Sequence, residues 1–103
     1  MNAIPEKFLP IGTVVLLKGA KKRIMISGFV VISKDDNKIW DYCGCAYPEG
    51  IITLEQTCLF NHDQIGKIFH MGLLDDDEQK ELQKELQNIM ESPDNYLNKN
   101  KDN

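Results

Sequence analysis

Long apolar runs are missing from this sequence. Its uninterrupted apolar stretches are short, whereas a helix that crosses a bilayer needs about 20 consecutive apolar residues. We therefore expect no membrane-spanning segment and no membrane partner. The N-terminus, MNAIPEKFLP, contains Lys7 but no long apolar region follows it, so it does not resemble a secretory signal. A cytoplasmic location is the resulting expectation.

Cysteine is scarce, and its number is odd. Three cysteines give no disulfide framework and fit a reducing compartment. Cys43, Cys45, Cys58 and His62 could be combined into a zinc set, but structural zinc sites usually show pairs spaced by two to four residues, and only one close pair exists here. We expect no metal and no cofactor, with the cysteines acting as small apolar residues.

Groupings typical of catalysis are also missing. A nucleophilic thiol needs a neighbouring base, and the sequence offers only Cys58 with His62 or His70. The sequence around Cys58 shows neither a glycine elbow nor a helix N-terminus directed at the thiol. We predict that the protein is not an enzyme.

A basic footprint over the whole chain is absent, since the net charge is −4. Residues 1–34 hold six basic side chains and one acidic one, and the remainder holds six lysines and fifteen acidic residues. Nucleic-acid binding by the Lys21-Lys22-Arg23 loop is therefore the less favoured alternative. Its other candidate contacts are one further cation and three aromatic side chains for base stacking: Lys18, Trp40, Tyr42 and Tyr47.

What is present is a series of strand patterns. Pro10 and Gly12 predict an entry turn, and the apolar run 13–17 predicts a buried strand. After a tight loop at 19–22, residues 23–33 predict a long second strand. Gly28 interrupts this strand, so we expect a bulge or a sharp bend there.

The pattern continues with shorter strands. The turn at 35–37 leads into a third strand over 38–47, which ends at Pro48. We expect a fourth strand within 51–60. Asn61 is a good cap for a short turn over 62–65. A last strand is predicted over 67–71, ended by Gly72.

A helix of about residues 75–91 follows the strands. Asp75 with Glu78 has the spacing of a capping box, and Ser92-Pro93 ends the pattern. Its apolar positions recur at i, i+4, i+7 and i+8 and form one stripe. The members of the stripe are Leu82, Leu86, Ile89 and Met90.

Together these patterns predict an α+β protein: a small, strongly bent antiparallel β-sheet or open barrel of four to five strands, followed by a C-terminal amphipathic helix. One hundred and three residues suffice for one domain. We assign residues 1–7 to a flexible lead-in and 8–91 to a single domain whose strands extend to about residue 72. Residues 92–103 read as a disordered polar tail.

Three segments resemble a known family in order and spacing: FLPIGTVVLLKGAKKRIMISG, DYCGCAYPEG, and FNHDQI followed by a glycine. The resemblance is to the family called domain of unknown function 4176, and it covers roughly residues 8–78. Its members are small proteins of Gram-positive bacteria, often encoded beside type VII secretion genes and LXG-type toxins. The chain departs from the family's pattern at Cys43 and Cys45, where ordinary apolar residues are expected, and at Ala20, where a second glycine is usual.

The resemblance brings no catalytic residues, because the family has none established. It implies a non-enzymatic, protein-binding accessory factor for an LXG-type toxin, acting as a chaperone, adaptor or targeting factor. The candidate partner is a helical region of that toxin, and the candidate contacts are the stripe residues Leu82, Leu86, Ile89 and Met90. The stripe could also cover only its own barrel. We expect a mixed case, with Leu82 and Leu86 facing inward and Met90 reachable.

Overall fold

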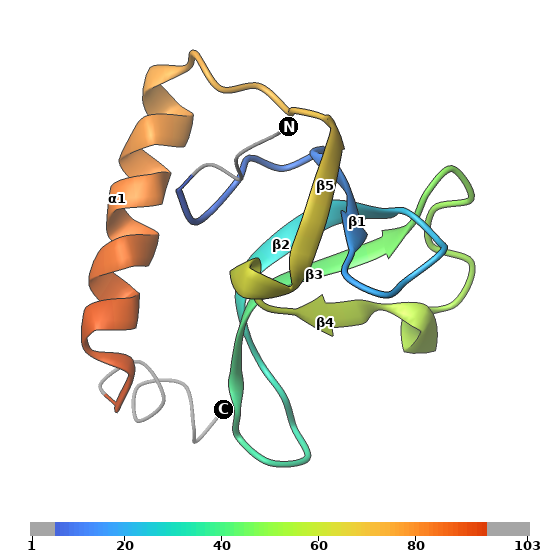
Figure 1. The fold of residues 1–103 in the computed structure, drawn as a ribbon. Helices are drawn as coiled ribbons and strands as arrows, with labels where there is room; N and C mark the ends of the chain where they lie inside the picture. The colour runs from blue at the N-terminus through green and yellow to red at the C-terminus, as the bar shows by residue number, and fades with distance from the viewer. Residues whose placement is uncertain (1–5, 95–103) are drawn as a thin grey trace.

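The computed structural model describes residues 6–94 and confirms the predicted α+β arrangement (Figure 1). Five strands precede one helix, and two short 3₁₀ turns flank β4. The elements are β1 (Val14–Leu17), β2 (Ile24–Ile32), β3 (Ile39–Ala46), η1 (Leu54–Gln56), β4 (Cys58–Phe60), η2 (His62–Gln64), β5 (Ile65–His70) and α1 (Asp77–Glu91). Most of the predicted lead-in and tail lies outside the described residues. Among the described residues, no helix is long and apolar enough to cross a membrane.

The strands form one antiparallel sheet in the order β4-β3-β2-β1-β5. Its two edge strands, β4 and β5, are joined directly by η2. A flat sheet of this size would place its edges about 19 Å apart, but the segment from Phe60 to Ile65, partly coiled in η2, reaches only about 13 Å. The sheet must therefore curl, as Figure 1 shows.

A bulge in β2 lies where Gly28 predicted it. Ile26 pairs with Gly44 and Gly28 pairs with Cys43, so Ser27 is an extra residue on the β2 side. A Cβ atom on Gly28 would lie 2.6 Å from the sulfur of Cys43, which is too close for an unshifted neighbour. The missing side chain therefore lets the two strands approach where β2 bends.

The first three strands match the predicted segments to within a residue at each end, and the fourth lies inside its predicted segment 51–60. The segment 51–60 holds only the short β4, because η1 occupies 54–56. Strand β5 begins at Ile65, two residues earlier than predicted. The turn η2 stops at Gln64, whose side chain accepts from the backbone N–H of Asn61 at 2.7 Å, and Ile65 then pairs with Leu17.

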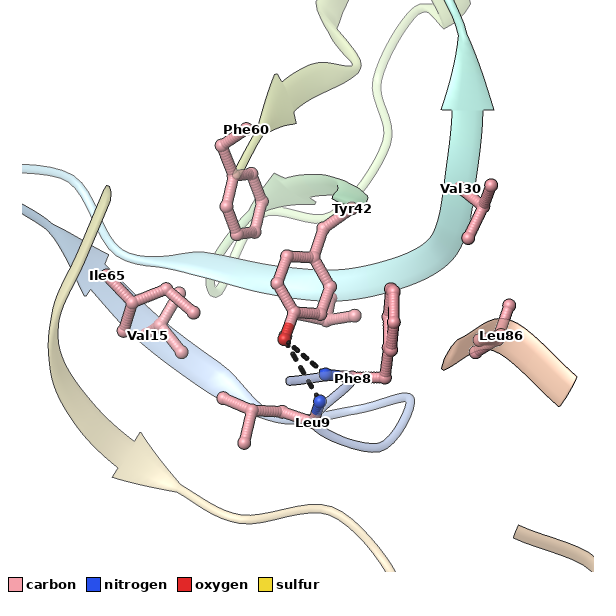
Figure 2. Close-up of a cluster of buried hydrophobic side chains, with 9 residues drawn as sticks. Phe8, Leu9, Val15, Val30, Tyr42, Phe60, Ile65 and Leu86 are labelled. Atoms are coloured by element: carbon pink, nitrogen blue, oxygen red, sulfur yellow. Dashed lines mark hydrogen bonds between the residues drawn. The ribbon is translucent and has the colours of Figure 1, made fainter. Parts of the chain in front are cut away.

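Aromatic side chains fill the inside of the curl (Figure 2). Tyr42 stacks on Phe60 with ring centroids 5.2 Å apart, and Phe8 lies tilted against Tyr42 at 6.1 Å. Tyr42 is fully buried, so it is a core residue and cannot stack on a base as the nucleic-acid alternative required. The other buried apolar members of this core cluster are Leu9, Val15, Ile26, Val30, Ile65 and Leu86.

Helix α1 begins at Asp77, and its cap is Asp76, not the predicted Asp75. The backbone of Asp76 is extended, and its carboxylate accepts the N–H of Gln79 at 3.0 Å. Asp75 instead forms an exposed ion pair with Lys80 at 3.3 Å. Both aspartates have capping chemistry, and the backbone conformation decided between them. In Figure 1 the helix stands beside the sheet, with the N-terminal loop between them.

Candidate functional site

An open groove of about 510 Å³ runs along α1. One wall is the helix, the other is the loop of residues 8–11, and Phe29 of β2 closes the floor. Its lining is largely apolar at the bottom and acidic along the helix: Phe8, Pro10, Ile11, Phe29, Leu73, Asp76, Glu78, Gln79, Glu81, Leu82, Gln83, Glu85 and Leu86.

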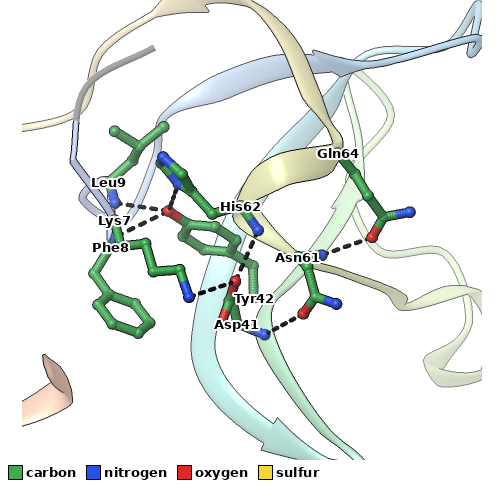
Figure 3. A network of polar contacts seen from close by, with 8 residues as sticks. All are labelled: Lys7, Phe8, Leu9, Asp41, Tyr42, Asn61, His62 and Gln64. Carbon is green, nitrogen blue, oxygen red and sulfur yellow. Dashed lines mark hydrogen bonds and ion pairs between the residues drawn. The ribbon is translucent and has the colours of Figure 1, made fainter. Parts of the chain in front are cut away.

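The loop wall is fixed from inside by Tyr42 (Figure 3). Its hydroxyl accepts the backbone N–H groups of Phe8 at 2.9 Å and Leu9 at 3.1 Å. The same hydroxyl lies 2.7 Å from Nδ1 of His62. Lys7 adds an ion pair with the buried Asp41 at 3.6 Å. The start of the described chain is thus held by strand β3 and the turn η2.

These contacts define the proton positions. A hydroxyl oxygen has two lone pairs and one hydrogen. Phe8 and Leu9 use the lone pairs, so Tyr42 donates its hydrogen to Nδ1 of His62, which is then the acceptor nitrogen of the ring. Burial raises the pKa of Tyr42 to about 12, although the backbone hydrogen bonds from Leu9 and Phe8 act in the opposite direction. The hydroxyl therefore remains neutral and serves as a structural tie.

The helix wall is set by Leu86, which is 6% exposed and belongs to the core. The side chain of Gln83 also donates to the carbonyl of Lys7 at 2.8 Å, which fastens the helix to the loop. Leu86 faces inward as predicted. Leu82 does not: it is 40% exposed and lines the groove.

The second half of the stripe lies closer to the core. Ile89 and Met90 are half-buried and pack against the core, so part of the Met90 side chain is exposed, and its contact with a partner stays a prediction. The helix rests against the loop at its start and against the core farther along. Its first apolar position, Leu82, therefore faces the groove, and the later positions face the protein interior.

One end of the groove depends on Gly72. Its N–H donates to the hydroxyl of the fully buried Thr13 at 3.0 Å, and a Cβ atom at this position would overlap the carbonyl oxygen of Ile11. This close approach brings two segments far apart in sequence together. Ile11, 50% exposed, and Leu73, 70% exposed, both lie at the groove as a result.

The rim of the groove is acidic. Glu78, Glu81 and Glu85 follow one another at i, i+3 and i+7 on α1, and Asp76 adds its capping carboxylate. Among the described residues that line the groove, none is a lysine or arginine. Sequence reasoning missed this rim, although the helical spacing of the three glutamates beside Leu82 and Leu86 was a usable signal.

The cysteines and histidines named in the sequence do not assemble into a site. Across residues 6–94, no three His, Cys, Asp or Glu side chains are grouped so that they could hold a metal. Burial raises the pKa of the Cys58 thiol, which disfavours the reactive thiolate. His62 directs Nδ1 at Tyr42.

The basic loop has partners of its own. Lys22 bonds Glu49 at 2.6 Å, and this bond holds the pKa of the Glu49 carboxyl below its usual value. The Arg23 guanidinium lies 5.1 Å from the ring centres of both Tyr47 and Phe69. The Nζ atom of Lys67 also lies over the Phe69 ring, 4.6 Å from its centre. The aromatic partners of the loop are therefore Tyr47 and Phe69, without Tyr42.

Comparison with known proteins yields one family. A model described as a domain of unknown function, DUF4176, matches residues 8–81. The matched segment includes the whole sheet, the loop wall of the groove and the first turn of α1. No curated protein and no solved structure matches the chain.

Proposed function

The chain belongs to the DUF4176 family, and from this membership we propose that it is a non-enzymatic, protein-binding accessory factor in type VII secretion of an LXG-type toxin. It would act in the cytoplasm as a chaperone, adaptor or targeting factor before the toxin is exported. The proposed link to the secretion system is supported by the family, because its members are often encoded beside such toxins. The support for protein binding is the groove.

The exposed apolar side chains of the groove carry this proposal. Ile11, Leu73 and Leu82 all line it and are all exposed. Their burial in a complex would contribute roughly 25 cal/mol for each Å² of apolar surface removed from water. Clustered apolar exposure at a concave surface is typical of protein-interaction sites.

The test is co-purification with an LXG-type toxin of the kind that the family's members are often encoded beside. Wild type should retain the toxin, and Leu82→Glu should lose it, because the substitution places a charge in an apolar contact. The melting temperature should stay near that of wild type, since Leu82 is already exposed. Ile52→Glu is the matched control: Ile52 is 70% exposed and does not line the groove.

Two results would overturn the proposal. One is a wild-type protein that retains no toxin under conditions in which both chains are folded. The other is a pair of variants that retain the toxin equally well, which would move the contact away from the groove.

A second candidate function is binding of single-stranded nucleic acid. The observation that favours it is the exposed pair Tyr47 and Phe69 around Arg23, beside the Lys21-Lys22 loop. The ion pair of Lys22 with Glu49 and the net charge of −4 act against it. We expect no oligonucleotide binding at physiological salt. Micromolar binding with a steep salt dependence, abolished by Lys21→Glu with Lys22→Glu, would favour it instead.

A further inference from the structure

Within residues 6–94, no basic side chain neutralises the acidic rim. Glu78, Glu81 and Glu85 form no ion pair with any described residue, while the nearby Lys80 pairs with Asp75 outside the groove. Like charges three and four residues apart on a helix destabilise it. A cationic partner along this rim would remove that repulsion, whereas a fatty acid, an anionic lipid surface or a nucleic acid would increase it.

The shape of the groove favours a helix over a strand. A peptide that adds to a sheet needs the free backbone groups of an edge strand. Neither edge strand, β4 or β5, contributes a residue to the lining. The lining comes from α1 and its cap Asp76, from Leu73, from the loop 8–11 and from Phe29. An occupant must therefore be recognised through its own side chains. A helix presents such side chains at i, i+3, i+4 and i+7.

The length of the groove sets the length of its occupant. The lining along this side runs from the cap Asp76 to Leu86 of α1, which corresponds to about 15 Å at the rise of a helix. Three turns of a second helix match this span. Apolar side chains on one stripe would cover Leu82 and Ile11, and side chains next to that stripe would lie along the carboxylates of the rim.

We propose, as a refinement that rests on the protein-binding function above, that the groove binds one amphipathic helix whose apolar stripe is flanked by Lys or Arg. The apolar stripe supplies contact area over the floor. The flanking cations pair with Glu78, Glu81 and Glu85 and fix the helix along α1. Charge complementarity of this kind selects partners and speeds their association.

Synthetic peptides test the proposal directly. Each has about 18 residues, long enough to hold helical structure, and the same leucine stripe; one carries Lys beside the stripe and the other carries Glu. Binding is measured by titration calorimetry at low and at physiological salt. The Lys peptide should bind at least about tenfold more tightly than the Glu peptide, and added salt should weaken it.

Charge reversal on the protein supplies the matching arm. Glu81→Lys with Glu85→Lys should weaken the Lys peptide by about tenfold and strengthen the Glu peptide. The control pair is Glu55→Lys with Glu91→Lys, which makes the same change of net charge at exposed residues outside the groove and should leave both affinities unchanged. Thermal melting of each variant verifies that the fold is intact.

Three outcomes would overturn the proposal: equal binding of the two peptides, unchanged affinity of the rim variant, or no binding of the Lys peptide. Sedimentation adds a fourth, a dimer of wild type that the rim variant dissociates, which would make a second copy the occupant. Failure here is distinct from failure of the proposed function. A toxin retained by wild type and by the rim variant alike would leave protein binding intact and remove only its basic, helical refinement.

Discussion

A single hydroxyl group, that of Tyr42, ties together three parts of the chain. It lies on β3, accepts two N–H groups of the N-terminal loop and donates to His62 of η2. The ring around it is the centre of the aromatic core. The loop that it fixes is one wall of the groove, so a core residue sets the shape of the candidate binding surface.

Tyr42→Phe should therefore destabilise the protein more than loss of a hydroxyl usually does. It leaves two buried N–H donors without their acceptor, and each unsatisfied donor costs about 1–3 kcal/mol. We expect a loss of about 2 kcal/mol or more in the free energy of unfolding, measured by urea denaturation. Tyr47→Phe is the control, since Tyr47 is exposed. Equal stability of the two variants would contradict the role given to the hydroxyl.

The same residue predicts how stability changes in alkali. Burial raises the pKa of folded Tyr42 to about 12 from the ordinary 10.0, so the folded state favours the neutral hydroxyl. The stabilisation is complete below pH 10 and is lost as the pH rises toward 12. Wild type should lose about 3 kcal/mol over this window through this group. Tyr42→Phe should lack that component, so the two denaturation curves should converge as the pH rises.

The bulge in β2 gives a prediction about two residues at once. Gly28→Ala places a methyl group against the sulfur of Cys43, and such overpacking costs about 1–3 kcal/mol. In a Cys43→Ala background the sulfur is absent, so the same change should cost less. A double-mutant cycle of melting curves measures the difference. Additive effects of the two changes would show that the contact with Cys43 does not limit this position.

At the scale of elements, α1 shows what a periodic pattern can and cannot predict. The stripe established that a helix exists and that Leu86 points inward. It could not show that Leu82 faces an open groove, because that depends on where Pro10 and Ile11 lie, and they are about seventy residues away along the chain. The choice between the adjacent caps Asp75 and Asp76 likewise followed from backbone geometry.

The two leucines of α1 should accordingly differ in their contribution to stability. Leu86→Ala removes a buried side chain and should cost about 2–5 kcal/mol. Leu82→Ala removes an exposed one and should change the free energy of unfolding by less than about 1 kcal/mol. Melting of the two variants side by side measures this. A Leu82→Ala protein that melts as early as Leu86→Ala would show that Leu82 is part of the core.

At the scale of the whole molecule, local patterns predicted the strands well and the contacts between distant segments poorly. Alternation and turn residues placed the first three strands, and Gly28 marked the bulge. The groove forms because Gly72 lies close to Ile11 and Gln83 bonds to Lys7. No local sequence pattern predicts these contacts between distant segments. The helical spacing of the three glutamates can be read from the sequence. Their role in a binding groove can be inferred only once the apolar floor beside them is known.

The position of the groove between the first and last described parts of the chain links occupancy to the opening of the fold. Helix α1 is not part of the hydrogen-bonded sheet and is tied to the loop through the Gln83 side chain. It can therefore detach while the hydrogen bonds between the strands remain intact. An occupant binds only when the helix is docked, and mass action then favours the docked form. Amide hydrogen exchange in α1 should slow in proportion to occupancy. Exchange in β2 and β3, which needs disruption of the sheet itself, gives the internal reference.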